Sequence, residues 1–437
     1  MNVESSTLLT LPLELREIIY KEVLLDPSQG PHILRACREV YSEARKFLYQ
    51  RPIIFGSQLE FYQWLEHRPE DVLEDIQEFH LQLQDVDLTP ILVPASTEYQ
   101  AERSRSLRTW KLYEEELDAL GRSFGRIPTV KSITIRALTG RQTHLYDDFL
   151  AKVLHMLGEH FSVLNDLTLA GNMHNQSFDF IPQFEALKRF SFDGFCASNS
   201  VETATILSEV NLTRISIVSQ PNLLAPTQGR QSSFTLKPQS FDSSVLRTIN
   251  QLASFSVTER MPTPTSSALF FNPEILGSLH SHKTLSELSL RLSNPPDEDA
   301  VDALNDFLAE NSSVERLELD WPRMDHAILY ILTNRLKSLW IRASSLAAAS
   351  DILGAVRGSK EGGDAQQLQR VVLIRNEWAA GEGDKYNEGE GQAEPSREEQ
   401  AGGAPDHADE TDENDFAIAK TSLNNLGVLV AWYTERL

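Results

Sequence analysis

Histidine, cysteine and carboxylate side chains most often carry catalysis or hold metal ions, and this sequence groups few of them in useful patterns. His155 and His160 stand five positions apart, which is poor spacing for two ligands on one face of a helix. Cys37 and Cys196 are the only two cysteines, and no Cys-x-x-Cys pair occurs. Gly-x-Ser-x-Gly, P-loop, dinucleotide-binding and His-Glu-x-x-His patterns are also absent from the sequence. We therefore expect no enzyme activity, no cofactor and no metal site.

Residues suited to binding occur in a series of predicted strands. Alternate residues of a strand face opposite ways, so the position between two apolar strand residues points away from the core. Six successive strands carry a small hydroxyl side chain at this position: Thr134, Thr168, Ser191, Ser216, Ser256 and Ser289. They predict a narrow polar face, although crowding and β-propensity alone would select the same residue types.

The next two predicted strands break this pattern with larger residues. The equivalent positions hold Glu318 and Trp340, and Arg316, Arg342 and Arg370 flank them on the same predicted face. Tryptophan and arginine dominate the hot spots of protein interfaces. We expect these five residues to bind a protein target, with Trp340 as the anchor. The alternative is that the C-terminal element covers Trp340.

The elements that position these residues follow a repeated pattern, apolar-x-x-apolar-x-apolar. It occurs at residues 76–81, 130–135, 164–169, 187–192, 212–217, 252–257, 285–290, 314–319, 336–341 and 368–373. Helical patterns, such as Leu145 to His160, lie between the matches. One strand and one helix per repeat predict an α/β solenoid with a parallel inner sheet, similar to irregular leucine-rich repeats. An ordinary doubly wound α/β domain would give the same alternation.

The N-terminal stretch predicts two amphipathic helices that form a hairpin. Pro12 suits a first helical position, and Glu14 follows where the helix dipole favours an acid. The first helix carries an apolar stripe of Leu11, Leu15, Ile18, Ile19 and Val23. One face of the second helix carries Ile33, Cys37, Val40, Tyr41, Ala44 and Leu48, so Cys37 is expected to be packed.

Two segments of this hairpin, LPLELREIIYKEVLL and CREVYSEARKFLY, resemble the F-box-like N-terminus of fungal proteins that often carry leucine-rich repeats. The resemblance implies docking on a Skp1-like adaptor of a cullin-RING ubiquitin ligase. The adaptor-binding residues that it implies are Leu11, Pro12, Leu15, Ile18 and Ile19. The alternative is that the apolar stripe packs on the next domain.

Four regions follow from these patterns. An F-box-like helical module spans residues 1–67, and a leucine-rich-repeat-like domain spans 68–376. Residues 377–415 hold 14 acidic and two basic residues, and we expect this acidic segment to be a disordered loop. Residues 416–437 predict a C-terminal capping helix, with Leu423, Leu426, Val430 and Tyr433 at helical spacing.

Composition limits the partners and the compartment. The formal net charge is -23, and phosphate recognition needs clustered Lys and Arg, so we expect no nucleic-acid and no membrane partner. No signal peptide and no long apolar run is evident. Two cysteines cannot form a disulfide framework, which favours the cytoplasm or nucleus.

Together these patterns favour a non-catalytic substrate receptor of an SCF-type (Skp1-cullin-F-box) ubiquitin ligase. The N-terminal helices would bind the adaptor, and the repeat face would bind an unidentified protein substrate. The alternative is an adaptor-independent interaction scaffold in which the helices only cap the solenoid. Exposure of the first helix distinguishes the two, because a cap must bury its apolar stripe.

Overall fold

The computed structural model describes residues 7–25, 31–88, 101–139, 142–219, 240–259, 268, 270–310, 313–325, 328–329, 332–375 and 408–434. The chain divides into two compact units, Met1–Asn250 and Gln251–Leu437, and each is described by itself. Most of the predicted acidic segment, residues 377–407, lies outside the described residues.

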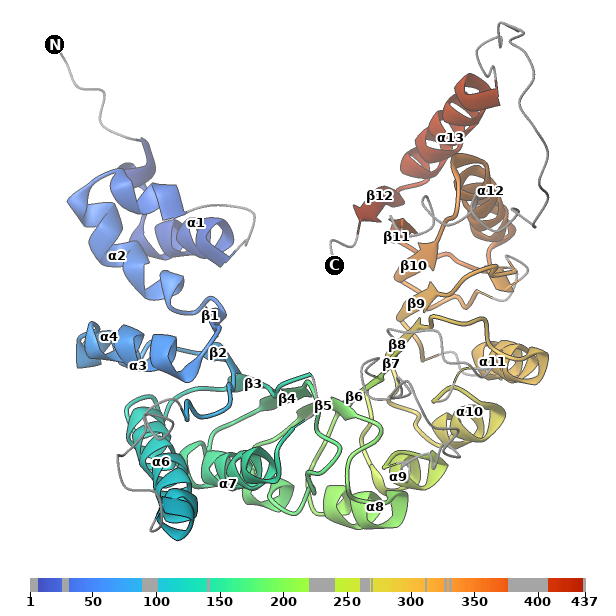
Figure 1. The fold of residues 1–437 in the computed structure, drawn as a ribbon. Helices are drawn as coiled ribbons and strands as arrows, with labels where there is room; N and C mark the ends of the chain where they lie inside the picture. Colours follow the sequence, from blue (N-terminus) through green and yellow to red (C-terminus); the bar gives the residue numbers. More distant parts are fainter. Residues whose placement is uncertain are drawn as a thin grey trace, which may run out of the picture. The chain divides into compact units, whose positions relative to one another are not determined.

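The first unit begins with a helical module and continues as alternating strands and helices (Figure 1). The module contains η1 (Thr7–Thr10), α1 (Leu13–Leu25), η2 (Pro31–Arg35) and α2 (Arg38–Leu48). The strands that follow are β1 (Ile53–Phe55), β2 (Glu78–Gln82), β3 (Ser132–Arg136), β4 (Asp166–Ala170), β5 (Arg189–Asp193) and β6 (Arg214–Ser219). The helices between and after them are α3 (Gln58–Glu66), α4 (Glu70–Leu73), α6 (Ala101–Phe124), α7 (His144–His160), η3 (Ile181–Gln183), α8 (Ser200–Ser208) and α9 (Ser243–Thr248).

The second unit has the same alternation of strands and helices (Figure 1). Its strands are β7 (Ser254–Glu259), β8 (Glu287–Arg291), β9 (Arg316–Asp320), β10 (Ser338–Arg342), β11 (Arg370–Arg375) and β12 (Leu429–Thr434). Its helices are α10 (Pro273–Leu279), α11 (Glu298–Glu310), α12 (Leu346–Gly362) and α13 (Ala408–Asn425).

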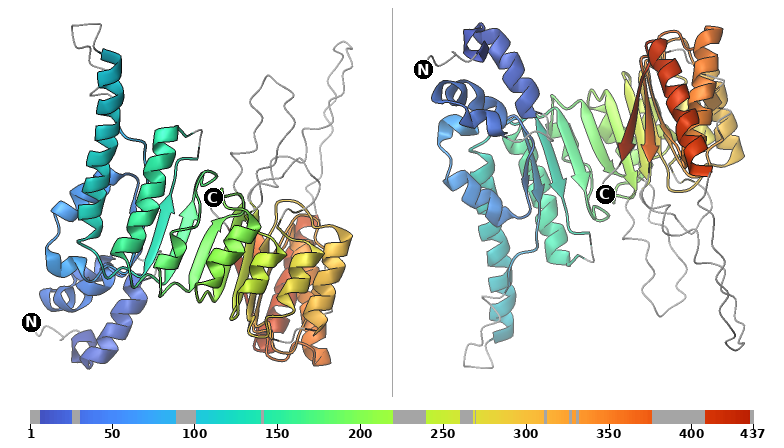
Figure 2. Two further views of the ribbon diagram at one scale, coloured as in Figure 1. Left: turned by 90° about the horizontal axis from the view of Figure 1, so that it is seen from below. Right: turned by 90° about the horizontal axis from the view of Figure 1, so that it is seen from above.

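Within each unit every strand pairs in parallel with the next strand along the chain. Figure 2 shows the strands of each unit side by side, with helices along one face of them. A doubly wound domain reverses its strand order at a switch point and carries helices on both faces. Neither feature occurs in the described part of the chain, and the architecture is therefore an irregular leucine-rich-repeat-like solenoid, as the sequence pattern predicts.

The core lies between the sheet and the helices because strand residues alternate between its two faces. In β4, Leu167 and Leu169 are 0% and 2% exposed, whereas Thr168 between them faces the other side and is partly exposed. From the helix side, α7 contributes apolar side chains along its length: Tyr146, Phe149, Leu150, Val153, Leu154 and Leu157. Burial of such side chains stabilises a fold by roughly 1.5–3 kcal/mol each.

Local sequence signals fix where several helices begin. Thr143 caps α7 by accepting a hydrogen bond from the Tyr146 backbone N–H, and Asn199 forms a capping box with Glu202 at α8. Such caps satisfy backbone donors that the first helical turn leaves free, and each is worth about 1 kcal/mol.

A glycine is required after β4. Gly171 has a φ of 83°, and a Cβ atom there would lie 2.0 Å from the carbonyl oxygen of Ala137. Neither the left-handed backbone nor the contact allows another residue. This glycine lets the chain turn closely past the end of the neighbouring repeat.

The C-terminal segment differs from the predicted single helix over residues 416–437. Helix α13 begins at Ala408 and ends at Asn425, and β12 then pairs in parallel with β11. Gly427, with a φ of 78°, ends the helix, since a left-handed glycine is a common helix stop. The β-branched and aromatic residues after it suit a strand, and their pairing satisfies the backbone groups along the edge of β11.

Among the described residues, no helix is both long and apolar enough to cross a membrane.

Candidate binding surfaces

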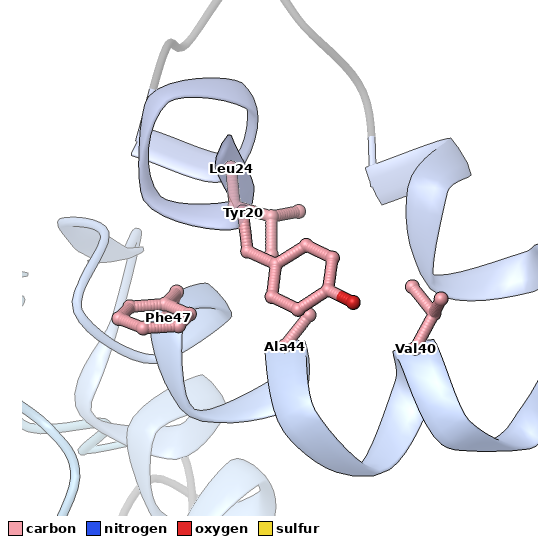
Figure 3. Close-up of a cluster of buried hydrophobic side chains, with 5 residues drawn as sticks. All are labelled: Tyr20, Leu24, Val40, Ala44 and Phe47. Atoms are coloured by element: carbon pink, nitrogen blue, oxygen red, sulfur yellow. The ribbon is translucent and has the colours of Figure 1, made fainter. Parts of the chain in front are cut away.

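Helices α1 and α2 pack on each other through a small apolar cluster. Its fully buried or nearly buried members are Tyr20, Leu24, Val40, Ala44 and Phe47, from both helices (Figure 3). Leu8, Leu9, Ile33 and Leu34 pack around this cluster. The helical module therefore has its own core.

Charged groups reinforce the contact between the two helices. Arg16 of α1 is 9% exposed, and its Nη2 lies 2.8 Å from Oε1 of Glu43. Its Nη1 lies 3.3 Å from Oε1 of Glu39. The hydroxyl of Tyr20 donates a hydrogen bond to the Glu43 carboxylate over 2.9 Å. The side of α1 that meets α2 is therefore partly polar.

The environment of Tyr20 favours its neutral form. Burial and the neighbouring Glu43 carboxylate raise the pKa of Tyr20 to about 12, because both disfavour a phenolate. Tyr20 thus keeps its proton across the neutral pH range and donates a hydrogen bond to Glu43. This hydrogen bond links α1 directly to α2.

The predicted apolar stripe of α1 is not the side that packs. Leu15 and Ile18 are 48% and 58% exposed, Pro12 is exposed, and Leu11 and Ile19 are partly buried. The residues of α1 that are buried lie at helical spacing on another side: Arg16, Tyr20 and Leu24. The module therefore leaves its predicted adaptor-binding residues largely open.

Sequence reasoning missed the exposure of Leu13. Leu13 is 43% exposed at the first position of α1, where it is in line with Tyr20 and Leu24 at i+7 and i+11 and therefore lies at the end of the packed side. We define the open face of α1 as Leu15 and Ile18.

Cys37 corrects another expectation from the sequence. It occupies the N-cap position of α2 and is exposed, not packed on an apolar face. The predicted helical face began at Ile33, but Ile33 lies in η2 and α2 begins only at Arg38, so Cys37 precedes the periodic part of the helix.

Residues predicted to bind a target share one face of the second unit's sheet, on the side away from the helices. Trp340 of β10 pairs in register with Glu318 of β9 and Val372 of β11. Ser338, which precedes Trp340 on the same face, pairs with both Arg316 and Arg370. The parallel register therefore gathers the predicted residues on adjacent strands.

Several of these side chains are held in ion pairs along the sheet. Oε1 of Glu318 lies 2.6 Å from Nε of Arg291, and its Oε2 accepts a hydrogen bond of 2.8 Å from Ser289. Nε of Arg342 lies 2.5 Å from Oδ1 of Asp320. Glu318 and Arg342 are thus committed to partners within the protein and shape the face instead of standing free on it.

Trp340 lies between a cation and a second aromatic ring. The Arg370 guanidinium is 5.5 Å from its ring centroid, within cation–π range. The Tyr433 ring of β12 meets it edge-on at a centroid distance of 5.5 Å. Because β10 and β12 flank β11, these rings meet above Val372, which is 1% exposed. Trp340 is partly covered by the C-terminal strand, and it remains partly exposed.

The predicted row of hydroxyl side chains forms within each unit. In the first unit, Thr134, Thr168, Ser191 and Ser216 follow one another in register. In the second unit, Ser256 pairs with Ser289. The row gives a polar, small-residue sheet face.

The described residues contain no group of three or more His, Cys, Asp or Glu side chains that could hold a metal ion.

No protein-family model matches the chain. No curated protein sequence matches it. Among solved structures, the chain is similar to a chain of the crystal structure of the Rad7 and Elc1 complex in yeast, at 10% identity and a TM-score of 0.38, covering 83% of this chain and 88% of that one. Two further similarities are to the TLR13–ssRNA13 complex and to a leucine-rich-repeat protein of Leptospira interrogans. The first has 10% identity, a TM-score of 0.30 and coverage of 75% and 44%; the second has 12%, 0.16 and coverage of 74% and 92%. These similarities assign no family to the chain.

Proposed function

We propose that this protein is a non-catalytic substrate receptor of an SCF-type ubiquitin ligase. The open face of α1 would dock on a Skp1-like adaptor, and the sheet face of the second unit would hold a protein target. The observation that carries the proposal is the exposure of Leu15 and Ile18 on a helix whose other side is already packed.

The open face suits recognition of a helix by a groove. Leu15 and Ile18 stand at i and i+3 of α1, a spacing with which amphipathic helices present anchors to a hydrophobic groove. Full burial of a leucine or isoleucine side chain is worth roughly 1.5–3 kcal/mol, so half-exposed anchors retain a useful part of that energy for a partner. This exposure favours docking over the alternative in which the module only caps the solenoid.

The contacts behind α1 would make docking efficient. Arg16 and Tyr20 hold α1 on α2 through Glu43, and Lys46 of α2 lies 2.6 Å from Glu17 of α1. A helix that is already ordered loses less conformational entropy on binding than a flexible segment does. The contacts with α2 thus hold α1 in place while its open face stays available to a partner.

Target binding is proposed for the region around Trp340. Trp340 with Arg370 over its ring combines the two residue types that are most enriched in interface hot spots. Arg316, on the same face, is exposed and lies 3.7 Å from Glu287. The neighbouring Glu318 and Arg342 would act by fixing the shape and charge of this face.

In this account the protein breaks no bond itself. A receptor raises the effective concentration of the target near the ligase, which converts a bimolecular encounter into a local one. The proposed receptor would act in the cytoplasm or the nucleus.

The test is a binding assay between the full chain and purified Skp1. We expect Leu15→Ala/Ile18→Ala to weaken binding about thirtyfold, equivalent to about 2 kcal/mol, because both substitutions shorten exposed anchors. Leu59→Ala/Val201→Ala is the matched control, since these residues are 62% and 70% exposed on α3 and α8.

Circular dichroism would establish that all variants fold. A folded wild-type chain that does not bind Skp1 would refute adaptor docking. Equal losses in the two double variants would show that binding does not depend on α1.

A further inference from the structure

One row of side chains crosses strands β9 to β12 on the sheet face of the second unit and carries exposed positive charge. The parallel register sets its members side by side, one from each strand: Arg316, Ser338, Arg370 and Leu429. Arg316 and Arg370 are exposed, and Leu429 at the end of the row is 71% exposed. We call these four residues the arginine row.

The acidic side chains of β9 on the same face are already held in ion pairs. Glu318 is bound by Arg291 and Ser289, and its side chain is 12% exposed. Asp320 is paired with Arg342, and its side chain is 6% exposed. The charge that β9 to β12 offer to a partner on this face is therefore positive, although the whole chain has a formal net charge of -23.

Arg316 has a carboxylate neighbour on β8, and this contact leaves its guanidinium largely available. Oε1 of Glu287 lies 3.7 Å from Nη1 of Arg316, which is longer than a hydrogen bond, and the Arg316 side chain is 59% exposed. Exposed ion pairs of this kind contribute little, because water and salt screen them. Arg316 can therefore turn to an anionic group of a partner without breaking a strong contact.

Arg370 is held in place by an aromatic ring and not by an acid. Its guanidinium lies 5.5 Å from the centroid of the Trp340 ring, and it forms no ion pair with another described residue. A cation–π contact positions a guanidinium but supplies no oxygen acceptor for its N–H groups. Those N–H groups match the two oxygens of a carboxylate, which they bind in parallel hydrogen bonds.

The last strand adds apolar surface beside the charged part of the face. Leu429 and Tyr433 lie on the same face of β12 and are 71% and 38% exposed, and Tyr433 meets Trp340 edge-on. Burial of such a leucine against an apolar side chain of a partner is favourable. The arginine row thus combines two sites for anionic groups with an apolar end.

We propose that the arginine row binds an acidic segment of the target protein, with carboxylates on Arg316 and Arg370 and an apolar side chain on Leu429. Neighbouring strands lie about 4.8 Å apart, so the three spacings from Arg316 to Leu429 amount to about 14 Å. In an extended peptide, positions i and i+4 point the same way and also lie about 14 Å apart. The geometry therefore fits the pattern acidic-x-acidic-x-apolar, with the middle acid within reach of the long Arg370 side chain. This inference deepens the target-binding half of the proposed function and rests on it.

The test is an NMR titration of the full chain, ¹⁵N-labelled at tryptophan, with acetyl-Glu-Gly-Glu-Gly-Leu-amide. The indole N–H of Trp340 donates to Ser338 in the arginine row over 3.2 Å, so its signal, assigned with Trp340→Phe, reports binding at this place. The reference peptide carries glutamine in place of both glutamates, which keeps the shape and removes the charge. We expect the acidic peptide to bind about tenfold more tightly than the reference, and Arg316→Gln/Arg370→Gln to lower its affinity about tenfold.

Arg357→Gln/Lys420→Gln is the matched control, because it removes the same charge from α12 and α13, on the helix side of the sheet. This variant should bind the acidic peptide within about twofold of wild type. Equal losses in both double variants, equal binding of the two peptides, or an unchanged Trp340 signal would each overturn the proposal.

A third peptide, with lysine in place of both glutamates, separates this proposal from the proposed function. Tighter binding of the lysine peptide than of the acidic one would overturn the acidic partner and leave the sheet face as a peptide-binding surface. The Skp1 assay depends on α1, so adaptor docking and the arginine row fail separately.

Discussion

Helices α1 and α7 divide their apolar residues in opposite ways. Helix α7 buries its whole apolar side, from Tyr146 to Leu157, against the repeat core. Helix α1 buries Arg16, Tyr20 and Leu24, and leaves Leu15 and Ile18 at 48% and 58% exposure. An apolar stripe in the sequence can therefore indicate either a buried face or an exposed one. In the repeats it indicates a core, and in the module it indicates a surface that folding has not used.

Truncating one leucine in each helix should show the largest difference. Leu154→Ala in α7 removes a side chain that is 1% exposed, and we expect it to lower the free energy of unfolding by about 2–5 kcal/mol. Leu15→Ala in α1 should change it by less than about 0.5 kcal/mol. Urea denaturation of both variants measures this. A comparable loss from Leu15→Ala would mean that the open face of α1 is a packing face.

Neutralising the partly buried carboxylate of Glu43 in the module should have an intermediate effect. Glu43→Gln leaves Arg16 with Glu39 as its remaining charged partner, and Glu39 is mostly exposed. We expect a loss of about 2–3 kcal/mol in the stability of the module, because a partly buried guanidinium loses its closest counterion.

Hydrogen exchange of the α1 amides measures that loss locally. Glu39→Gln is the control, and its expected cost is below about 1 kcal/mol because its side chain is 58% exposed. Equal effects of the two substitutions would show that burial does not strengthen the Arg16 contact.

The smallest effect concerns alkaline pH. The pKa of Tyr20, at about 12, lies above the ordinary value of 10, so its contribution to stability is complete below pH 10 and is lost as pH rises through 12. Glu43→Gln should lower the pKa of Tyr20 while leaving it above 10, since burial is the larger cause. NMR titration of ¹³Cζ-labelled tyrosine, with Tyr20→Phe to assign the signal, measures this. A pKa that Glu43→Gln leaves unchanged would remove Glu43 as a cause.

The repeat architecture could be predicted from the sequence because its signal is local. The pattern Leu164-x-x-Leu167-x-Leu169 predicts both a strand and the face of it that is buried. The observed strand β4 contains Leu167 and Leu169, and both are buried. Strand order was also accessible, since short repeats place each strand beside the next.

The binding surfaces were only partly predictable because they depend on tertiary contacts. The side of α1 that packs contains Arg16, and a search for apolar stripes overlooks a charged residue whose partner, Glu43, comes from another helix. The ion pair between Glu318 and Arg291 likewise depends on the register of adjacent strands. The C-terminal strand was missed because the spacing of Val430 and Tyr433 fits a helix, although Gly427 marked its end.

The division of α1 into a packed and an open side also bears on how this protein can evolve. Substitutions at Leu15 and Ile18 carry little folding cost, since these side chains are already about half exposed to water. Selection can therefore alter affinity for a docking partner at these positions without first compensating a loss of stability. A change at Arg16 or Tyr20 must instead be compensated by a change at their partner Glu43 on α2. We therefore expect the sequence of the open face to diverge faster than the contact between the two helices.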